Sequence, residues 1–132
     1  MPYINYRIGS SLKESQKKTI YTETTDYMNS IMRKKREVTV VHIEESPPQQ
    51  WSVNGSRLDD KNPIPVYVDI KVTDGTNTPE EKSEMINRTM KMLKDCLGST
   101  QEACYIVIDD ILSNSWGYDG LTQEYRAQLN KK

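Results

Sequence analysis

MPYINYRI, at residues 1–8, is the stretch that decides the fold, because apolar Ile4, Tyr6 and Ile8 alternate with other side chains. A period of two is typical of a strand with one face against a core. Proline directly follows the initial methionine, and a small residue there normally permits removal of that methionine. Pro2 would then carry a free secondary amine, whereas the nitrogen of an internal, acylated proline has no basicity. The dipeptide alone favours an ordinary start that has no role.

Length and composition favour one compact domain of 132 residues whose core gains burial from subunit contacts. Only 35% of the chain is hydrophobic, there is no Phe, and the mean hydropathy is −0.78. A net charge of −1 gives no reason to expect a nucleic acid or a charged membrane as partner. The basic run at residues 33–36 is interpreted as the solvated end of a helix. Without an apolar span or a signal sequence, the expected location is cytoplasmic.

The sulfur and imidazole side chains point to no metal site and no cofactor. Cys96 and Cys104 have a spacing that matches no metal or redox motif, and we interpret them as buried reduced thiols. The single histidine, His42, lies in a β-branched strand and is expected to be a packed or hydrogen-bonded core residue.

The sequence contains an internal duplication, with two similar halves, and this is its most informative property. A shift of 65 positions aligns the later parts of the two halves, and a shift of 64 aligns their opening strands. The aligned pairs include Trp51 with Trp116, Gly55 with Gly120, and Tyr3 with Tyr67. We therefore expect a single domain made of a first unit, 1–58, and a second unit, 66–132, joined by the linker 59–65.

Each unit is predicted to be strand, helix, strand. The first helix is expected to begin with a capping box of Ser11 and Glu14, and the second with Thr78, Pro79 and Glu81. Their apolar faces are predicted to comprise Ile20, Tyr27, Met28, Ile31 and Met32 in the first helix and Met85, Ile86, Met90, Leu93 and Leu97 in the second. Gly98 is a natural stop, and the returning strands are expected at 38–44 and 104–109.

The predicted fold is α+β, with two βαβ units forming one four-stranded sheet and both helices on one face. The two strands of each unit should be parallel, because a helix connects them. The other face of such a sheet must meet another surface.

The pattern resembles the tautomerase superfamily, in particular members that fuse two 4-oxalocrotonate tautomerase-like units in one chain. The resemblance covers almost the whole chain. It rests on the proline after Met, the duplicated βαβ unit, VVHIEE at 40–45 leading to PPQQW at 47–51, and the weaker echo NSWGYDG at 114–120. It implies a homotrimer in which the open sheet faces meet around an axis, with Pro2 as the catalytic residue. The counterpart of Pro2 near Pro65 is internal and cannot act as a base.

A tautomerase (isomerase) that needs no cofactor and acts on a small enolisable carbonyl acid is the leading hypothesis. Burial in an apolar pocket lowers the pKa of an amine, so a neutral Pro2 could remove a proton alpha to a carbonyl. Two alternatives stay open. One is a hydratase, dehalogenase or decarboxylase of a short three-carbon acid. The other is a non-catalytic assembly or binding protein of the same fold.

The arginines that such relatives use to hold carboxylates are missing. Their places are taken by Leu12 and Thr76 after the opening strands, and by Val40 and Tyr105 at the start of the returning strands. Tyr105 is interpreted either as a substrate donor, as the resemblance to fused dehalogenases implies, or as an interface tyrosine.

The remaining candidates for binding substrate are four cations and two tryptophans. Arg7 and Lys71 occupy equivalent places on the opening strands, where they either line an anion-attracting interior or pair with carboxylates such as Asp69. Lys13 and Arg36 are either cations supplied to a neighbour's Pro2 or solvated side chains. The resemblance assigns Trp51 and Trp116 to an aromatic wall of the pocket, and interface anchoring is the alternative.

Overall fold

Alternating strands and helices dominate a computed structural model that describes residues 2–130. The predictions about Met1, including its removal, lie outside the described residues. The first half contains β1 (Tyr3–Ile8), α1 (Glu14–Ser30), the 3-10 turn η1 (Arg36–Val38), β2 (Val40–Glu45), η2 (Pro48–Gln50), β3 (Ser52–Val53) and β4 (Ser56–Arg57). The second contains β5 (Val66–Thr73), α2 (Pro79–Leu97), β6 (Tyr105–Ile111), β7 (Gly117–Tyr118), β8 (Leu121–Thr122) and α3 (Gln123–Leu129).

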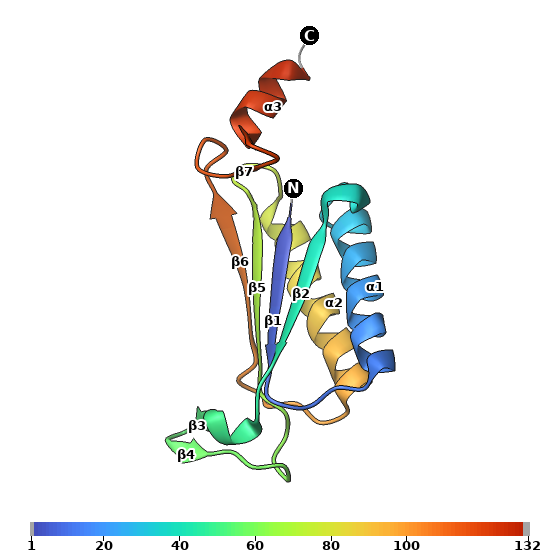
Figure 1. Cartoon of the computed structure of the whole chain (residues 1–132), viewed down its shortest axis with the longest axis vertical. Coiled ribbons are helices and arrows are strands. Elements are labelled where there is room, and N and C mark those ends of the chain that lie inside the picture. Colours follow the sequence, from blue (N-terminus) through green and yellow to red (C-terminus); the bar gives the residue numbers. More distant parts are fainter. Residues whose placement is uncertain (1, 131–132) are drawn as a thin grey trace.

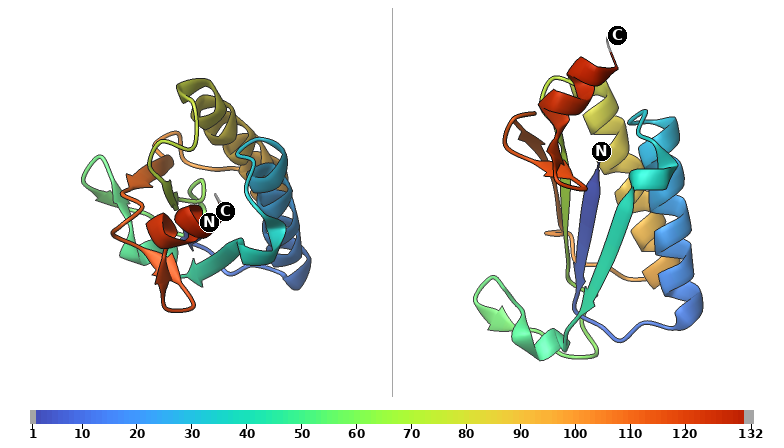
Figure 2. Two further views of the ribbon diagram at one scale, coloured as in Figure 1. Left: turned by 90° about the horizontal axis from the view of Figure 1, so that it is seen from above. Right: turned by 45° about the horizontal axis from the view of Figure 1, so that its top comes forward.

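The main sheet has the strand order β2-β1-β5-β6, and α1 and α2 lie side by side on one of its faces (Figures 1 and 2). Within each half the two strands are parallel, whereas β1 and β5 run antiparallel at the centre, with Asn5 opposite Asp69. The predicted α+β fold is therefore confirmed. Because the central strands are antiparallel, equivalent residues of the two halves lie at opposite ends of the sheet.

The core lies between the sheet and the two helices. Ile4, Tyr6 and Ile8 of β1 are fully buried, as the alternation predicts, and β5 buries every second residue in the same way. The Tyr6 hydroxyl lies 2.6 Å from Thr24 Oγ1 of α1, so the one polar group that β1 sends into the core is satisfied.

The helix boundaries agree with the prediction for α2 but not for α1. Thr78 Oγ1 accepts from the Glu81 N–H, and Gly98 ends the helix at a φ of 89°. The Ser11 cap is wrong: α1 begins at Glu14 with Lys13 in the cap position, and the Lys13 N–H donates to Gln16 Oε1 at 2.8 Å. The chain uses the extra residues to travel from the end of β1 to the helix layer.

The predicted helix faces need two corrections. Ile86 is 38% exposed, and Met92 takes its place in the core, so the buried stripe of α2 is rotated relative to the prediction. In the first half, Ile31 and Met32 follow the end of α1 at Ser30 but still pack against the core.

The interpretation of the basic run at 33–36 as a solvated helix end was only partly right: Arg33, Lys35 and Arg36 are exposed, but Lys34 is buried and the run follows the end of α1 at Ser30. Arg33 has a φ of 59° and turns the chain after α1, and its side chain binds Glu81 with Nε 2.7 Å from Oε2. Lys34 is buried, with Nζ donating to Thr76 Oγ1 at 2.7 Å. Burial and the neighbouring Arg33 lower the pKa of the Lys34 ammonium. The run thus fastens the end of α1 to the start of α2.

The ion pair of Arg33 and Glu81 predicts a pH dependence of stability. Hydrogen bonds from Arg33, with the Thr78 N–H, lower the pKa of Glu81 to about 2. A lowered carboxyl pKa contributes stability that is present above the unfolded-state pKa and lost as the pH falls through the folded-state value. Arg33→Met should therefore be less stable than the parent at pH 7, and the gap should close between about pH 4.5 and 2. Urea denaturation at fixed protein concentration across this range measures it. A constant gap would contradict the pair's role.

Two expectations about polar or reactive core residues were wrong or only partly right. His42 is on the open face of the sheet rather than in the core: its side chain is 52% exposed, with Nδ1 3.4 Å from the Tyr3 hydroxyl. Cys96 and Cys104 are free, as expected, but only half-buried. No helix within residues 2–130 is long and apolar enough to cross a membrane.

Candidate active site

Pro2 is buried at the start of β1, at the end of the sheet where α3 stands (Figures 1 and 2). Its carbonyl accepts from the Val40 N–H at 3.4 Å, which extends the parallel pairing of β1 and β2 by one bond. The backbone of Pro2 is therefore held by the sheet. A rigid strand is a better support for a reacting group than a loop.

A pocket of about 310 Å³ opens next to Pro2. Val38 and Val40 from the first half and Trp116, Gly117 and Tyr118 from the second half line it together with Tyr3. These walls are mainly apolar and contain no charged side chain. A free amine in such surroundings would lose hydration of its cation, so its pKa would fall towards neutral pH.

Trp116 is fixed by its hydrogen bond and by the hairpin that follows it. Its indole N–H donates to Thr73 Oγ1 at 3.2 Å, so the ring is tied to the end of β5. The hairpin of β7 and β8 turns at Asp119 and Gly120, which both have positive φ, as an Asp-Gly turn of type I′ requires. Gly117 lies so close to the Leu121 backbone that a Cβ would be 1.9 Å from its carbonyl oxygen. A side chain at 117 would push the hairpin away from Pro2.

Trp51 lies at the opposite end of the sheet from Pro2. Its indole N–H donates to Ser46 Oγ at 2.9 Å, and the ring packs beside Gly9, which in turn contacts Pro65. The sequence assigned both tryptophans to the wall of a pocket. Within one chain, Trp116 shares a pocket with Pro2 and Trp51 does not. Because β1 and β5 are antiparallel, Trp116 comes to the Pro2 end of the sheet and Trp51 to the Pro65 end.

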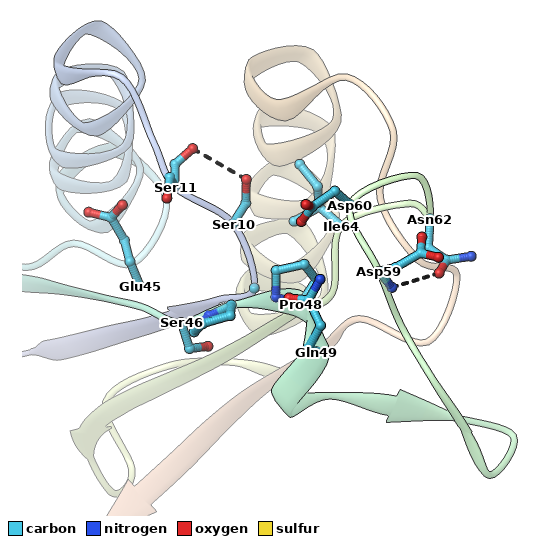
Figure 3. A pocket seen from close by; sticks show the side chains of 12 residues that line it. Ser10, Ser11, Glu45, Ser46, Pro48, Gln49, Asp59, Asp60, Asn62 and Ile64 are labelled. Atoms are coloured by element: carbon cyan, nitrogen blue, oxygen red, sulfur yellow. Dashed lines mark hydrogen bonds between the residues drawn. The ribbon is translucent and has the colours of Figure 1, made fainter.

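A larger pocket, of about 610 Å³, lies at the Pro65 end and is shown in Figure 3. Its walls carry three carboxylates, Glu45, Asp59 and Asp60, and no cation. Glu45 is already engaged: Lys17 Nζ and the Leu12 N–H both bind it, and they lower its pKa. The neighbouring proline nitrogen is an amide, so despite its size this pocket has no counterpart of the Pro2 amine.

Arg7 and Lys71 lie on the open face of the sheet and are paired with carboxylates. Arg7 Nε is 3.4 Å from Glu44 Oε2. Lys71 Nζ lies 3.1 Å from Asp109 and 3.3 Å from Asp69, and these contacts raise its pKa, Asp109 most. The sequence left open whether these two cations line an anion-attracting interior or pair with carboxylates. Within the chain, both are paired with carboxylates.

Tyr105, Lys13 and Arg36 lie outside the Pro2 pocket of the same chain. Tyr105 is 65% exposed at the start of β6, which is the far end of the sheet from Pro2. Lys13 is at the start of α1, also at that far end. Arg36 is near the Pro2 end, but its guanidinium binds Asp26 at 2.7 Å. A role for Tyr105 or Lys13 at Pro2 would have to come from a neighbouring subunit, whereas a role for Arg36 would require its guanidinium to leave Asp26.

Sequence reasoning missed Val38 and Tyr118 as pocket residues and did not anticipate α3. The signals were present: Asp119-Gly120 marks a hairpin, and Thr122 with Glu124 marks a helix start. Thr122 Oγ1 indeed accepts from the Tyr125 N–H at 3.1 Å. Among residues 2–130, no cluster of three His, Cys, Asp or Glu side chains is placed to hold a metal ion.

Comparisons with known proteins agree with this architecture. A family profile described as "Tautomerase enzyme" matches residues 67–126, which is most of the second half. "Probable tautomerase K2" of Dickeya dadantii (strain 3937) is 29% identical over 62 residues, covering 47% of this chain and 92% of that relative. A relative of this size corresponds to about one of the two units.

Two solved structures have the same fold over nearly the whole chain. The first is Pt0534 inactivated by 2-oxo-3-pentynoate, with a TM-score of 0.82, 15% identity, and coverage of 94% of this chain and 98% of that one. The second is the R7 fused 4-OT wild-type asymmetric trimer, with a TM-score of 0.82, 14% identity, and coverage of 95% and 98%. Both match the complete arrangement of two units rather than one half.

Proposed function

We propose that the chain is a fused two-unit member of the tautomerase superfamily, of the 4-oxalocrotonate tautomerase-like type, and that it isomerises a small enolisable carbonyl acid at Pro2. The observation that carries the proposal is that Pro2 is buried in an apolar pocket. Of the two equivalent prolines, Pro2 and Pro65, Pro2 is the one whose nitrogen would become a free amine on removal of Met1. The match to the tautomerase family profile and to a probable tautomerase supports a tautomerase-type activity, and Pro2 as the acid–base group and the substrate class are the finer parts of the proposal.

The reaction needs one group that takes and returns a proton. The neutral Pro2 amine removes a proton from the carbon alpha to a carbonyl, and the C–H electron pair forms the enolate. The resulting ammonium then returns the proton to another atom of the conjugated system, so the enzyme is unchanged and no electron acceptor is required. Positioned acid–base catalysis of this kind contributes about 10²–10⁴-fold to the rate.

We also propose that the active form is a homotrimer. The open face of the sheet exposes Val40, Tyr105 and Val107 beside neutralised ion pairs. A face of this composition resembles a subunit interface more than a solvated surface. The R7 fused 4-OT is a trimer with the same fold. In such an assembly Tyr105 and Arg36 would be available to a neighbouring pocket.

The alternative reactions on short three-carbon acids depended on Tyr105 as a donor near Pro2. Within the chain Tyr105 is at the opposite end of the sheet from Pro2, so these reactions would need the Tyr105 of a neighbouring subunit, and no contact within one chain favours them over tautomerisation. A non-catalytic assembly or binding protein requires that Met1 stays attached or that Pro2 is unreactive. Retention of Met1, or an unreactive Pro2, is therefore the result that would most clearly contradict the proposed function.

Covalent capture of the amine tests the proposal. 2-Oxo-3-pentynoate is an alkynyl ketone whose activated triple bond adds an amine. We expect intact mass spectrometry to show protein without Met1 gaining one inhibitor per chain, with tandem spectra placing it on Pro2. Turnover of phenylenolpyruvate should fall in step with this labelling. Uniform retention of Met1, or labelling elsewhere with turnover intact, would overturn the mechanism.

A further inference from the structure

Lys34 is a buried amine that the proposed reaction does not use. Its side chain is 7% exposed, and Nζ donates to Thr76 Oγ1 at 2.7 Å. The Thr76 hydroxyl in turn donates to the Thr73 carbonyl at 2.6 Å, so its oxygen is oriented to accept from Lys34. Within residues 2–130 Nζ has no other hydrogen-bond partner, and no carboxylate lies within 4.0 Å of it. Two of the three N–H groups of an ammonium at this position therefore lack a partner from the described chain.

Lys34 and Thr76 line a hollow of about 430 Å³ at the end of the sheet where α3 stands (Figure 1). We call it the α3 hollow. Its other walls include Lys35, Gln123 and Arg126, and no carboxylate from the described part of the chain lines it. Lys35 and Arg126 also have no carboxylate within 4.0 Å among residues 2–130. The hollow thus has room for a small group on Nζ, and its charge favours a group that is negative.

Two donors on the α3 side of the hollow have no acceptor. Arg126 stacks over the Tyr118 ring at 3.8 Å and donates through Nη2 to the Tyr118 carbonyl at 3.0 Å. The Nε of Arg126 is nevertheless buried without a partner, as is Nε2 of Gln123 one helical turn earlier. A buried donor without an acceptor is costly, so each of these atoms indicates an acceptor that the unmodified chain does not supply.

We propose that Lys34 is a carbamylation site, at which carbon dioxide adds reversibly to Nζ and the resulting carbamate is held by Gln123 and Arg126. The lone pair of the neutral amine attacks the carbon of carbon dioxide, an N–C bond forms, and one C=O electron pair moves to oxygen. One N–H proton is lost to water, so the amine becomes an anion and nothing is oxidised or reduced. The N–H that remains keeps the bond to Thr76 Oγ1. The two new oxygens are the acceptors that the two buried donors lack.

Lys34 is better suited to this addition than the paired lysines, because only a neutral amine attacks carbon dioxide. Burial lowers the pKa of Lys34 and the neighbouring Arg33 adds to the effect, whereas Glu81 and Asp110 oppose it. Hydrogen-bonded carboxylates raise the pKa of Lys71 instead, so its amine stays protonated. The inference goes beyond the proposed function, since it does not depend on the acid–base role of Pro2.

Chemical trapping tests the site directly. Protein equilibrated with isotopically labelled bicarbonate and carbon dioxide is treated with triethyloxonium tetrafluoroborate, which converts a carbamate into a stable ethyl carbamate. Tandem mass spectrometry then locates the label, so that any adduct on a free Pro2 amine is counted separately. We expect Lys34 to carry at least about tenfold more label than its exposed neighbour Lys35, since each unit of lowered pKa gives about tenfold more neutral amine. Absence of label at Lys34, or equal label on the two lysines, would overturn the proposal.

Gln123→Leu tests whether α3 holds the carbamate. It removes a donor that has no partner in the unmodified chain, so the unmodified fold should not lose stability. The label at Lys34 should nevertheless fall about fivefold, as expected for the loss of one hydrogen bond. Gln128→Leu makes the same change at an exposed position of the same helix and should keep the label. Equal labelling of Lys34 in the two variants would contradict the assigned contact with Gln123.

The effect of carbon dioxide on stability is a second readout. At constant pH and ionic strength, raising carbon dioxide should raise the Tm of the parent, because the carbamate forms on the folded chain. Lys34→Arg keeps a positive charge at this position but cannot add carbon dioxide, so its Tm should not respond. An equal response in parent and Lys34→Arg would show that carbon dioxide acts elsewhere. If Lys34→Arg does not fold, Gln123→Leu takes its place and should show a smaller response than Gln128→Leu.

Discussion

Pro2→Ala is expected to lower kcat for ketonisation of phenylenolpyruvate by at least about 10²-fold, the lower end of what one positioned acid–base group contributes. The alanine variant also offers a terminal amine after removal of Met1. That amine is acyclic and rotates freely, whereas the pyrrolidine ring of proline fixes its nitrogen against the pocket wall. Steady-state kinetics on protein whose processing has been verified by intact mass measures the effect.

Pro65→Ala is the matched control for this prediction. It changes the same residue type at the equivalent end of the other half, where the nitrogen is an amide, so turnover should stay within about threefold of the parent. Protein that retains Met1 should be as inactive as Pro2→Ala because its proline nitrogen is acylated. Equal activity of Pro2→Ala and Pro65→Ala would show that neither proline nitrogen is the acid–base group.

The frame of the fold could be predicted because it depends on local periodicity and on duplication. The alternation of Ile4, Tyr6 and Ile8 fixes which face of β1 is buried, and the Thr78–Glu81 box fixes the start of α2. Where these local signals were ambiguous, packing decided. Ser11 has the spacing of a cap, but the path from β1 to the helix layer carries the chain past it, and Lys13 takes the position.

The repeat alone could not predict which residues lie at the Pro2 end of the sheet and which lie at the Pro65 end. Aligning Trp51 with Trp116 shows that they are equivalent, but not which of them lies beside Pro2. That depends on the direction in which β1 and β5 pair. The antiparallel pairing places Tyr3 opposite Lys71, at the end of β5, so the segment after the second half's returning strand comes to Pro2.

The burial of Lys34 likewise depends on the tertiary structure. A run of four basic residues is usually solvated, and here α1 ends three residues before the run. The chain then reverses at Arg33, whose positive φ turns Lys34 inwards towards Thr76 of the other half. The energetic compensation for burying the ammonium includes the Thr76 hydroxyl, a contact between units that no pattern within one unit can reveal.

Trp116→Ala is expected to lower kcat/KM at pH 7 by about tenfold or more, whereas Trp51→Ala should leave it within about threefold. Trp116 is part of the wall of the Pro2 pocket, and Trp51 is fixed at the Pro65 end. Loss of the indole admits water, which stabilises the ammonium form of Pro2 and raises its pKa. A rise of one unit leaves about one tenth as much neutral amine at a pH below the pKa.

The pH dependence distinguishes this effect from simple loss of packing. If Trp116 acts through the amine, the acidic limb of the kcat/KM profile of Trp116→Ala should move to higher pH, and activity should recover in part above it. Trp116→Phe, which restores apolar cover but not the hydrogen bond to Thr73, should lie nearer the parent. Both alanine variants lose a half-buried indole, so their losses of stability should be similar. Equal losses of activity with unshifted profiles would mean that the two ends of the sheet are equivalent, and Pro2 would then have no special environment.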